Sequence, residues 1–170
     1  MPSDAGHLVM LLRHAIAEDP GSRPDEERRL TPEGKRKLRE VVAGMRALGL
    51  PVEAVLSSPL TRAGETAQMV ADVFDVGVEI TPALAPGGRA EAVFAALEGR
   101  RAAGVVLVGH EPDMGELMST LLVGSSGLVS VRFKKAGLAG ITVASLPPHA
   151  AGILEFFLAP AQLRRIGRPD

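Results

Sequence analysis

Two arginines and two of the chain's four histidines are candidates to act together on one bound anion. They are Arg13, His14, Arg62 and His110. A neutral imidazole can attack phosphorus and form a covalent intermediate, which divides one difficult reaction into two easier steps. Guanidinium groups hold phosphate oxygens in a planar fork and stabilise the charge on a transferring phosphoryl group. These residue types therefore predict chemistry on a phosphoryl group if the fold brings them together.

Short apolar runs that predict buried strands precede these four side chains. The runs are residues 8–12, 54–57 and 104–108. In open α/β sheets, ligands bind beyond the carboxyl ends of the parallel strands, which is where all four side chains are expected. Arg62 and the backbone after His110 also lie near predicted helix starts, where free amides and the helix dipole favour anions. Such a pocket takes its positive charge from side chains, so it needs no P-loop and no metal ion.

Helix signals alternate with these strand signals over the first two-thirds of the chain. Thr31 and Pro32 predict the start of an amphipathic helix that Gly49 ends. Further helices are predicted after Ser58-Pro59 and at 89–97, 112–122 and 160–166, with a short strand at 78–80. The alternation predicts an α/β fold, a three-layer sandwich with a mostly parallel central sheet flanked by helices. Beyond residue 127, β-like runs at 129–133, 140–145 and 152–157 predict edge strands, at least one of them antiparallel. We expect one domain over residues 1–170.

Composition limits the classes of function. Hydrophobic residues make up 46% of the 170 residues and the net charge is −1, so we expect a globular chain and no nucleic-acid partner. The absence of cysteine excludes disulfides, thiolate metal sites and a cysteine nucleophile. No apolar run approaches the roughly 20 residues that span a bilayer, and the first residues lack the features of a signal peptide. We therefore expect no membrane partner and a cytoplasmic location.

Four ordered motifs carry a resemblance to a known family. They are Leu-Leu-Arg13-His14-Ala15, Leu30-Thr31-Pro32-Glu33-Gly34, Ser57-Ser58-Pro59-Leu60-Thr61-Arg62-Ala63 and Val108-Gly109-His110-Glu111-Pro112. In this order they resemble the phosphoglycerate mutase-like histidine phosphatase superfamily, and most closely its short bacterial branch, the SixA-like phosphohistidine phosphatases. The resemblance covers essentially the whole chain, including the late Glu155–Pro160 stretch.

The resemblance implies a role for each matched residue. His14 would be the nucleophile, Arg13 and Arg62 would clamp the phosphoryl oxygens, and His110 would be the second imidazole. The phosphate would lie near the backbone amide of Glu111. The implied partner is a phosphorylated protein carrying phosphohistidine, or a small phosphorylated substrate, with inorganic phosphate in the pocket. No cofactor and no metal ion are implied.

Two departures from the family pattern bear on the substrate. The common Arg-His-Gly signature reads Arg-His-Ala here, and Ala15 fits if its backbone φ is negative. Larger members carry a carboxylic acid that protonates the leaving oxygen, and Glu79, Glu91 and Glu98 match no such context. Phosphorylated imidazole needs this acid less than an alkoxide does, because it can leave protonated. Together with short connections that leave little room for a lid, this favours phosphohistidine on a protein as the substrate.

Other interpretations of these residues remain open. The chain could be a broad phosphomonoesterase acting on small metabolites, or a phosphate-binding regulatory module without turnover. Residues 26–29 predict an exposed charged loop that could fringe the pocket. Arg132, Lys134 and Lys135 predict a solvated face, with docking of an acidic protein as the alternative.

Overall fold

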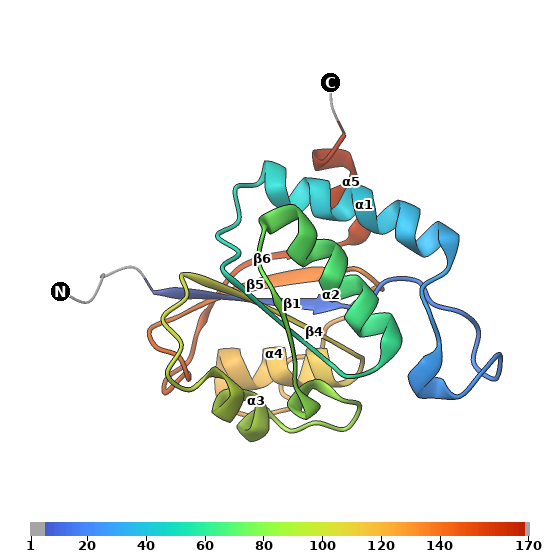
Figure 1. Ribbon diagram of the computed structural model, residues 1–170. Helices are drawn as coiled ribbons and strands as arrows, with labels where there is room; N and C mark the ends of the chain where they lie inside the picture. The colour runs from blue at the N-terminus through green and yellow to red at the C-terminus, as the bar shows by residue number, and fades with distance from the viewer. Residues whose placement is uncertain (1–5, 169–170) are drawn as a thin grey trace.

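The strands form one mixed sheet in the computed structural model, which describes residues 6–168 (Figure 1). They are β1 (His7–Arg13), β2 (Ala54–Ser57), β3 (Val78–Ile80), β4 (Gly104–Gly109), β5 (Leu138–Val143) and β6 (Ile153–Leu158), in the order β3-β2-β4-β1-β5-β6. The first four strands in this order run parallel, and β5 and β6 are antiparallel to their neighbours. The N-terminal segment in which the sequence predicts no signal peptide lies largely outside the described residues.

Helices cover both faces of the sheet. One layer holds α1 (Pro32–Ala47), α2 (Thr61–Phe74) and α5 (Pro160–Ile166), and the other holds α3 (Ala90–Leu97) and α4 (Asp113–Val123). Two 3-10 helices, η1 (Asp25–Glu27) and η2 (Pro82–Leu84), lie in loops. No helix within residues 6–168 combines the length and the apolar character required to cross a bilayer.

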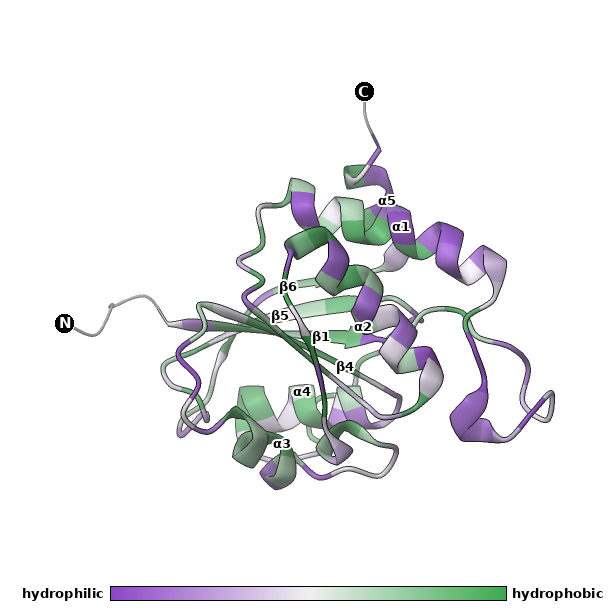
Figure 2. Ribbon diagram, viewed as in Figure 1, coloured by the Kyte–Doolittle hydropathy of each residue, from purple (hydrophilic) through white to green (hydrophobic). Residues whose placement is uncertain are grey.

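Each face of the sheet has its own apolar core. On one face, Met10 and Leu12 of β1 pack against the layer formed by α1, α2 and α5. On the other face, Val9 and Leu11 pack against α3 and α4. The central strands are buried on both faces, which explains their continuous apolar runs. Figure 2 shows apolar strands between the two helical layers, with hydrophilic residues most evident on α1 and on the loop before it. The predicted three-layer α/β fold is confirmed.

The strand register aligns the ends from which the candidate site residues project. Arg13 at the end of β1 pairs with Gly109 at the end of β4, and Ser57 at the end of β2 pairs with Val108. The three carboxyl ends therefore meet at one edge of the sheet. The residues that follow these ends are brought together by the register alone.

The start of α1 is fixed against the segment that follows His14. The Thr31 side chain accepts a hydrogen bond from the Gly34 N–H at 2.9 Å, as expected for an N-cap. The Thr31 N–H donates to the carbonyl oxygen of Ile16 at 3.0 Å. A Cβ atom on Gly34 would lie 2.1 Å from that same Ile16 oxygen. Glycine therefore permits the helix to approach this closely.

One predicted strand is wrong, because residues 129–133 form irregular backbone rather than a strand. The N–H groups of Leu128 and Val129 donate to the Ser119 hydroxyl, at 3.1 and 3.0 Å. The Phe133 carbonyl accepts from the Arg13 guanidinium, and its side chain is buried in the core beside α4. The alternating apolar pattern thus reflects the burial of single side chains. The backbone groups that a neighbouring strand would pair bond instead to the side chains of Ser119 and Arg13.

Candidate active site

The structure brings the four predicted site residues together at the carboxyl ends of β1, β2 and β4. His14 follows β1, and its backbone N–H donates to the Gly109 carbonyl at the end of β4 at 3.0 Å. The rings of His14 and His110 lie with their centroids 5.2 Å apart and their planes at 53°. His14, His110 and Arg62 are 6%, 4% and 5% exposed. Two imidazoles and a guanidinium are thus enclosed in one small volume.

His14 presents one ring nitrogen for attack on an electrophile. Its Nδ1 lies 2.8 Å from the carbonyl oxygen of Ala15, so Nδ1 donates and Nε2 keeps its lone pair. Burial lowers the pKa of His14 to about 3, and the positive charge of Arg62 and Arg13 acts in the same direction. The imidazole is therefore neutral at physiological pH, which is the form that a nucleophile requires.

Ala15 occupies the position of the family's glycine without strain. Within residues 6–168, the non-glycine residues with positive φ are Asp75 and Ala136, so the φ of Ala15 is negative. The Ala15 N–H donates to the Thr66 hydroxyl at 3.1 Å, and that hydroxyl donates to the Arg62 carbonyl at 2.7 Å. The backbone beside His14 is in this way tied to the first turns of α2.

His110 lies opposite His14 and is bound to Ser58. The His110 Nε2 and the Ser58 Oγ are 2.7 Å apart, and Ser58 is fully buried. Burial lowers the pKa of His110 to about 4, with a further contribution from the Arg62 charge. His110 is therefore also neutral at physiological pH. The sequence pattern predicted Ser58 as the cap of the next helix, but α2 begins at Thr61 after Leu60, and the Ser58 hydroxyl bonds to His110 instead.

The two arginines are held by backbone carbonyl groups. The Arg13 Nη1 donates to the Phe133 oxygen at 2.8 Å. The Arg62 Nη1 donates to the Asp25 backbone oxygen at 2.7 Å, and its Nη2 donates to the Asp25 carboxylate at 3.2 Å. Burial lowers the pKa of Arg13, opposed by the charge of Glu111.

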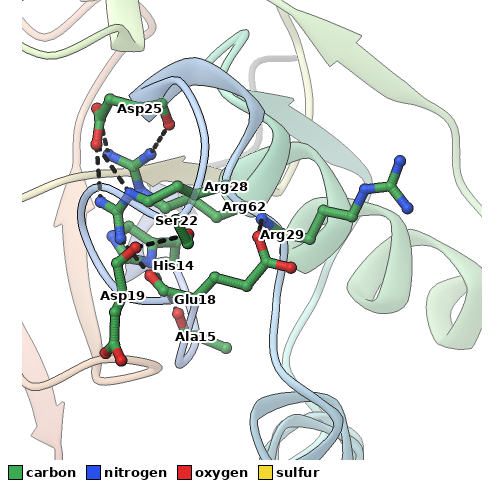
Figure 3. Close-up of polar contacts among 9 residues, drawn as sticks. All are labelled: His14, Ala15, Glu18, Asp19, Ser22, Asp25, Arg28, Arg29 and Arg62. Atoms are coloured by element: carbon green, nitrogen blue, oxygen red, sulfur yellow. Dashed lines mark hydrogen bonds and ion pairs between the residues drawn. The ribbon is translucent and has the colours of Figure 1, made fainter.

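The loop between β1 and α1 lies against the pocket, which the sequence predicted only as a possible fringe. Figure 3 shows the guanidinium groups of Arg28 and Arg62 side by side beneath Asp25. Glu18 closes the base of this loop, because its carboxylate accepts from the Arg29 N–H at 3.1 Å and its carbonyl accepts from Arg28. This loop therefore contacts the pocket through Asp25, a residue that the sequence pattern did not single out. A short acidic loop carries no signal that distinguishes it from a solvated one.

Three buried side-chain nitrogens in the described part of the chain have no hydrogen-bond partner. They are the Arg13 Nε, the Arg62 Nε and the His110 Nδ1. All three belong to residues predicted for the site. Leaving a buried donor unpaired is costly, and a functional site is one place where such groups occur. All three can donate, and an oxyanion is the type of group that satisfies unpaired donors.

The carboxyl groups considered as proton donors do not join this cluster. Glu79 pairs with Arg100 and Glu91 pairs with Arg89. Among the described residues, neither they nor Glu98 bond to the pocket side chains. The Glu111 carboxylate accepts from the Gly115 N–H at 2.9 Å, and burial raises its pKa. Its backbone amide remains the predicted phosphate contact.

Two cavities lie outside this cluster. One of about 450 Å³ lies between α3 and α4, and one of about 150 Å³ lies beside Ala15, with Lys37, Lys135 and Arg164 in its lining. Neither cavity is lined by His14 or His110. Within residues 6–168, no three His, Asp or Glu side chains are grouped to hold a metal ion.

The fold and the pocket define an α/β protein with a buried site of paired histidines and arginines at the carboxyl edge of its sheet. The sequence model of the histidine phosphatase superfamily (branch 1) matches residues 9–86. An uncharacterised protein of Picosynechococcus sp. PCC 7002 is 36% identical over 156 residues, which cover 88% of this chain and 93% of the relative. The chain therefore belongs to the histidine phosphatase superfamily and is a phosphatase.

Two further comparisons lie within the short bacterial branch. The phosphohistidine phosphatase SixA of Escherichia coli is 28% identical over 162 residues, which cover 92% of this chain and 96% of SixA. A structure of the protein histidine phosphatase SixA complexed with tungstate is 27% identical and superposes with a TM-score of 0.79, over 92% of this chain and 99% of that one. The predicted resemblance is confirmed.

Proposed function

We propose that this phosphatase removes the phosphoryl group from phosphohistidine on a protein, through a covalent intermediate on His14. The observation that carries the proposal is the hydrogen bond from the His14 Nδ1 to the Ala15 oxygen, which leaves Nε2 unprotonated in a ring whose pKa the neighbouring Arg62 and Arg13 charges help to lower. The likeness to SixA supports this choice of substrate.

The reaction has two steps with His14 in both. In the first, the Nε2 lone pair attacks phosphorus, a P–Nε2 bond forms and the P–N bond of the substrate breaks. The substrate ring enters with a proton on its second nitrogen, so it takes the electrons of the broken P–N bond and leaves as neutral imidazole without a proton donor from the enzyme. In the second, water attacks the phosphorus, the P–Nε2 bond breaks and inorganic phosphate leaves, with one water proton released. His14 returns to its neutral form, ready for a further turnover.

Arg13 and Arg62 have two tasks in this scheme. Arg13 and Arg62 place fixed positive charge next to the equatorial oxygens, where negative charge persists through the transfer. The low pKa of His14 follows in part from these same charges. The arginines therefore both keep the nucleophile neutral and bind the group that it attacks.

Two observations favour a protein-borne phosphoramidate over an alkyl phosphate. No carboxylic acid among the described residues bonds to His14 or His110, and a phosphorylated imidazole needs the least help in leaving. Arg132, Lys134 and Lys135 are exposed, and the residues around them contact the site: the Ala136 N–H donates to the Arg13 and His14 carbonyls at 3.0 and 3.2 Å. An exposed cationic segment next to residues that bond to the site suits an acidic protein.

Phosphate release from a histidine-phosphorylated carrier protein and from an aryl phosphate tests the proposal. The variants are His14→Ala and, as a matched control, His149→Ala, which removes an exposed histidine. We expect rapid release from the carrier with the wild type and the control, and none above background with His14→Ala. Release mainly from the aryl phosphate would instead indicate a broad phosphomonoesterase. Phosphate binding without turnover on either would indicate a binding module.

A further inference from the structure

Ser58 makes the one hydrogen bond that the His110 side chain has among the described residues. The serine follows β2, has no exposed surface, and places its Oγ 2.7 Å from the His110 Nε2. The N–H of Leu60 donates to the same oxygen at 3.2 Å. The second ring nitrogen of His110, Nδ1, is buried and has no partner.

The hydrogen bonds of Ser58 determine which nitrogen of His110 carries the proton. A serine hydroxyl has one proton to donate and two lone pairs. The Leu60 N–H uses a lone pair, and the hydroxyl proton then needs an acceptor. If the His110 Nε2 carried a proton, both this nitrogen and the Leu60 N–H would donate to the Ser58 oxygen. The buried hydroxyl proton of Ser58 would then have no acceptor. The consistent arrangement has Ser58 donating to an unprotonated Nε2, with the proton on Nδ1.

We propose that Ser58 is a positioning residue that holds neutral His110 in its Nδ1-protonated tautomer, so that Nδ1–H donates to the bound phosphoryl group. The identity of that anion rests on the proposed function. The assignment explains why Nδ1 is buried without a partner, as are the Nε atoms of Arg13 and Arg62. It also gives His110 a defined task, because a neutral imidazole N–H supplies a hydrogen bond to a transition-state oxygen without first binding a proton. The low pKa of His110 is in keeping with this task.

The tautomer is measured directly with ¹⁵N-labelled imidazole NMR at neutral pH, without turnover. We expect the wild type to show a protonated Nδ1 and an unprotonated Nε2 on His110. Ser58→Ala should lose this pattern, and Ser58→Thr, which keeps a hydroxyl, should restore it. Ser57→Ala is the matched control, because the Ser57 hydroxyl donates to the Ser58 carbonyl and does not contact His110. An Nε2-protonated His110 in the wild type, or an unchanged pattern in Ser58→Ala, overturns the proposal.

Kinetics separate positioning from a purely structural role. Removing an oxyanion donor outright costs about 100- to 1,000-fold in kcat, so partial loss of the right tautomer should cost roughly tenfold to hundredfold in Ser58→Ala with little change in KM. Substitution of His110 itself gives a second comparison, because an Asn amide nitrogen lies near the position of Nδ1 and a Gln amide nitrogen near that of Nε2. His110→Asn should retain more kcat than His110→Gln, and the reverse order contradicts the proposal. An inactive wild type would defeat the proposed function and leave the NMR result interpretable.

Discussion

The Arg62 guanidinium bonds to Asp25 twice, through the backbone oxygen at 2.7 Å and the carboxylate at 3.2 Å. The two partners differ in environment, because the Arg62 side chain is 6% exposed and the Asp25 side chain is 59% exposed. An exposed carboxylate contributes little to such a pair, since water screens its charge. The backbone oxygen, which no substitution removes, is the stronger constraint on the arginine.

This difference predicts unequal effects of two substitutions. Arg62→Ala removes a buried guanidinium that we propose binds the phosphoryl group, and it should lower kcat by about 100- to 1,000-fold. Asp25→Ala keeps the backbone contact and should lower kcat/KM by less than about fivefold, the worth of an exposed ion pair. Steady-state kinetics on the carrier protein measure both. An Asp25→Ala loss as large as that of Arg62→Ala would show that the carboxylate itself takes part in the reaction.

The two site histidines should bind protons only at a pH well below the usual pKa of histidine. The pKa values of about 3 for His14 and about 4 for His110 compare with about 6.5 for an unfolded histidine. Both rings should stay neutral in the free enzyme at about pH 5, as followed by the pH dependence of their imidazole NMR signals. His14→Ala and His110→Ala assign the signals. Titration of either ring near pH 6.5 contradicts this electrostatic account of the pocket.

The same pKa values predict how stability changes with pH. Because the folded pKa values lie below the unfolded one, the unfolded chain binds more protons as the pH falls from about 6.5 towards 4. The free energy of unfolding should therefore decrease over this interval through these two residues. Urea denaturation at several pH values measures the slope, and the double variant His14→Ala/His110→Ala should show a shallower one. An equal slope in the double variant would assign the dependence to other groups.

Reversing the charge of the exposed loop tests docking separately from chemistry. Arg132→Glu, Lys134→Glu and Lys135→Glu together should lower kcat/KM on the phosphorylated carrier by about tenfold or more, mainly through slower association. Turnover of a small phosphoramidate should change far less. Reversal of Arg89 and Arg101, exposed residues elsewhere on the surface, is the control. Equal losses on both substrates would indicate a damaged pocket instead of a docking surface.

Gly34 should be intolerant of a side chain. A Cβ there would lie 2.1 Å from the Ile16 carbonyl oxygen, so Gly34→Ala must displace α1 from the segment after His14 and should cost about 1–3 kcal/mol of stability. Gly64 of α2 is the matched control, since nothing lies within 4 Å of its Cβ position. Gly64→Ala should be neutral or stabilising, because alanine favours a helix. Thermal unfolding compares them, and a neutral Gly34→Ala would contradict the close contact.

Most of the fold could be predicted from the sequence, because buried parallel strands appear as continuous apolar runs and the Thr31 cap marks the start of α1. The helix that Thr31 and Pro32 begin and the strand ending at Ser57 lie where they were predicted. The strand predicted at residues 129–133 is wrong because an alternating apolar pattern indicates which side chains are buried and does not indicate the hydrogen-bond partners of the backbone. There the partner is the Ser119 hydroxyl, which the local sequence does not reveal.

The site likewise contains residues that the sequence predicts and residues that it does not. Arg13, His14 and His110 could be predicted from the strand ends, because the parallel topology brings those ends to one edge of the sheet independently of the loop conformations. Asp25 and Ser58 act through hydrogen bonds whose geometry depends on the folded loops, so their residue types alone do not predict the contacts. The neutrality of the histidines likewise follows from burial beside the arginines and is visible only in three dimensions.

Trapping the phosphorylated enzyme tests the central claim most directly. Rapid acid-free quenching during turnover of a ³²P-phosphohistidine carrier, followed by peptide mapping, should place an acid-labile label on His14, which chases to inorganic phosphate. His14→Ala should carry no label, while His149→Ala should match the wild type. Turnover without any label on the enzyme, or labelling that persists in His14→Ala, would contradict His14 as the phosphate-accepting nucleophile.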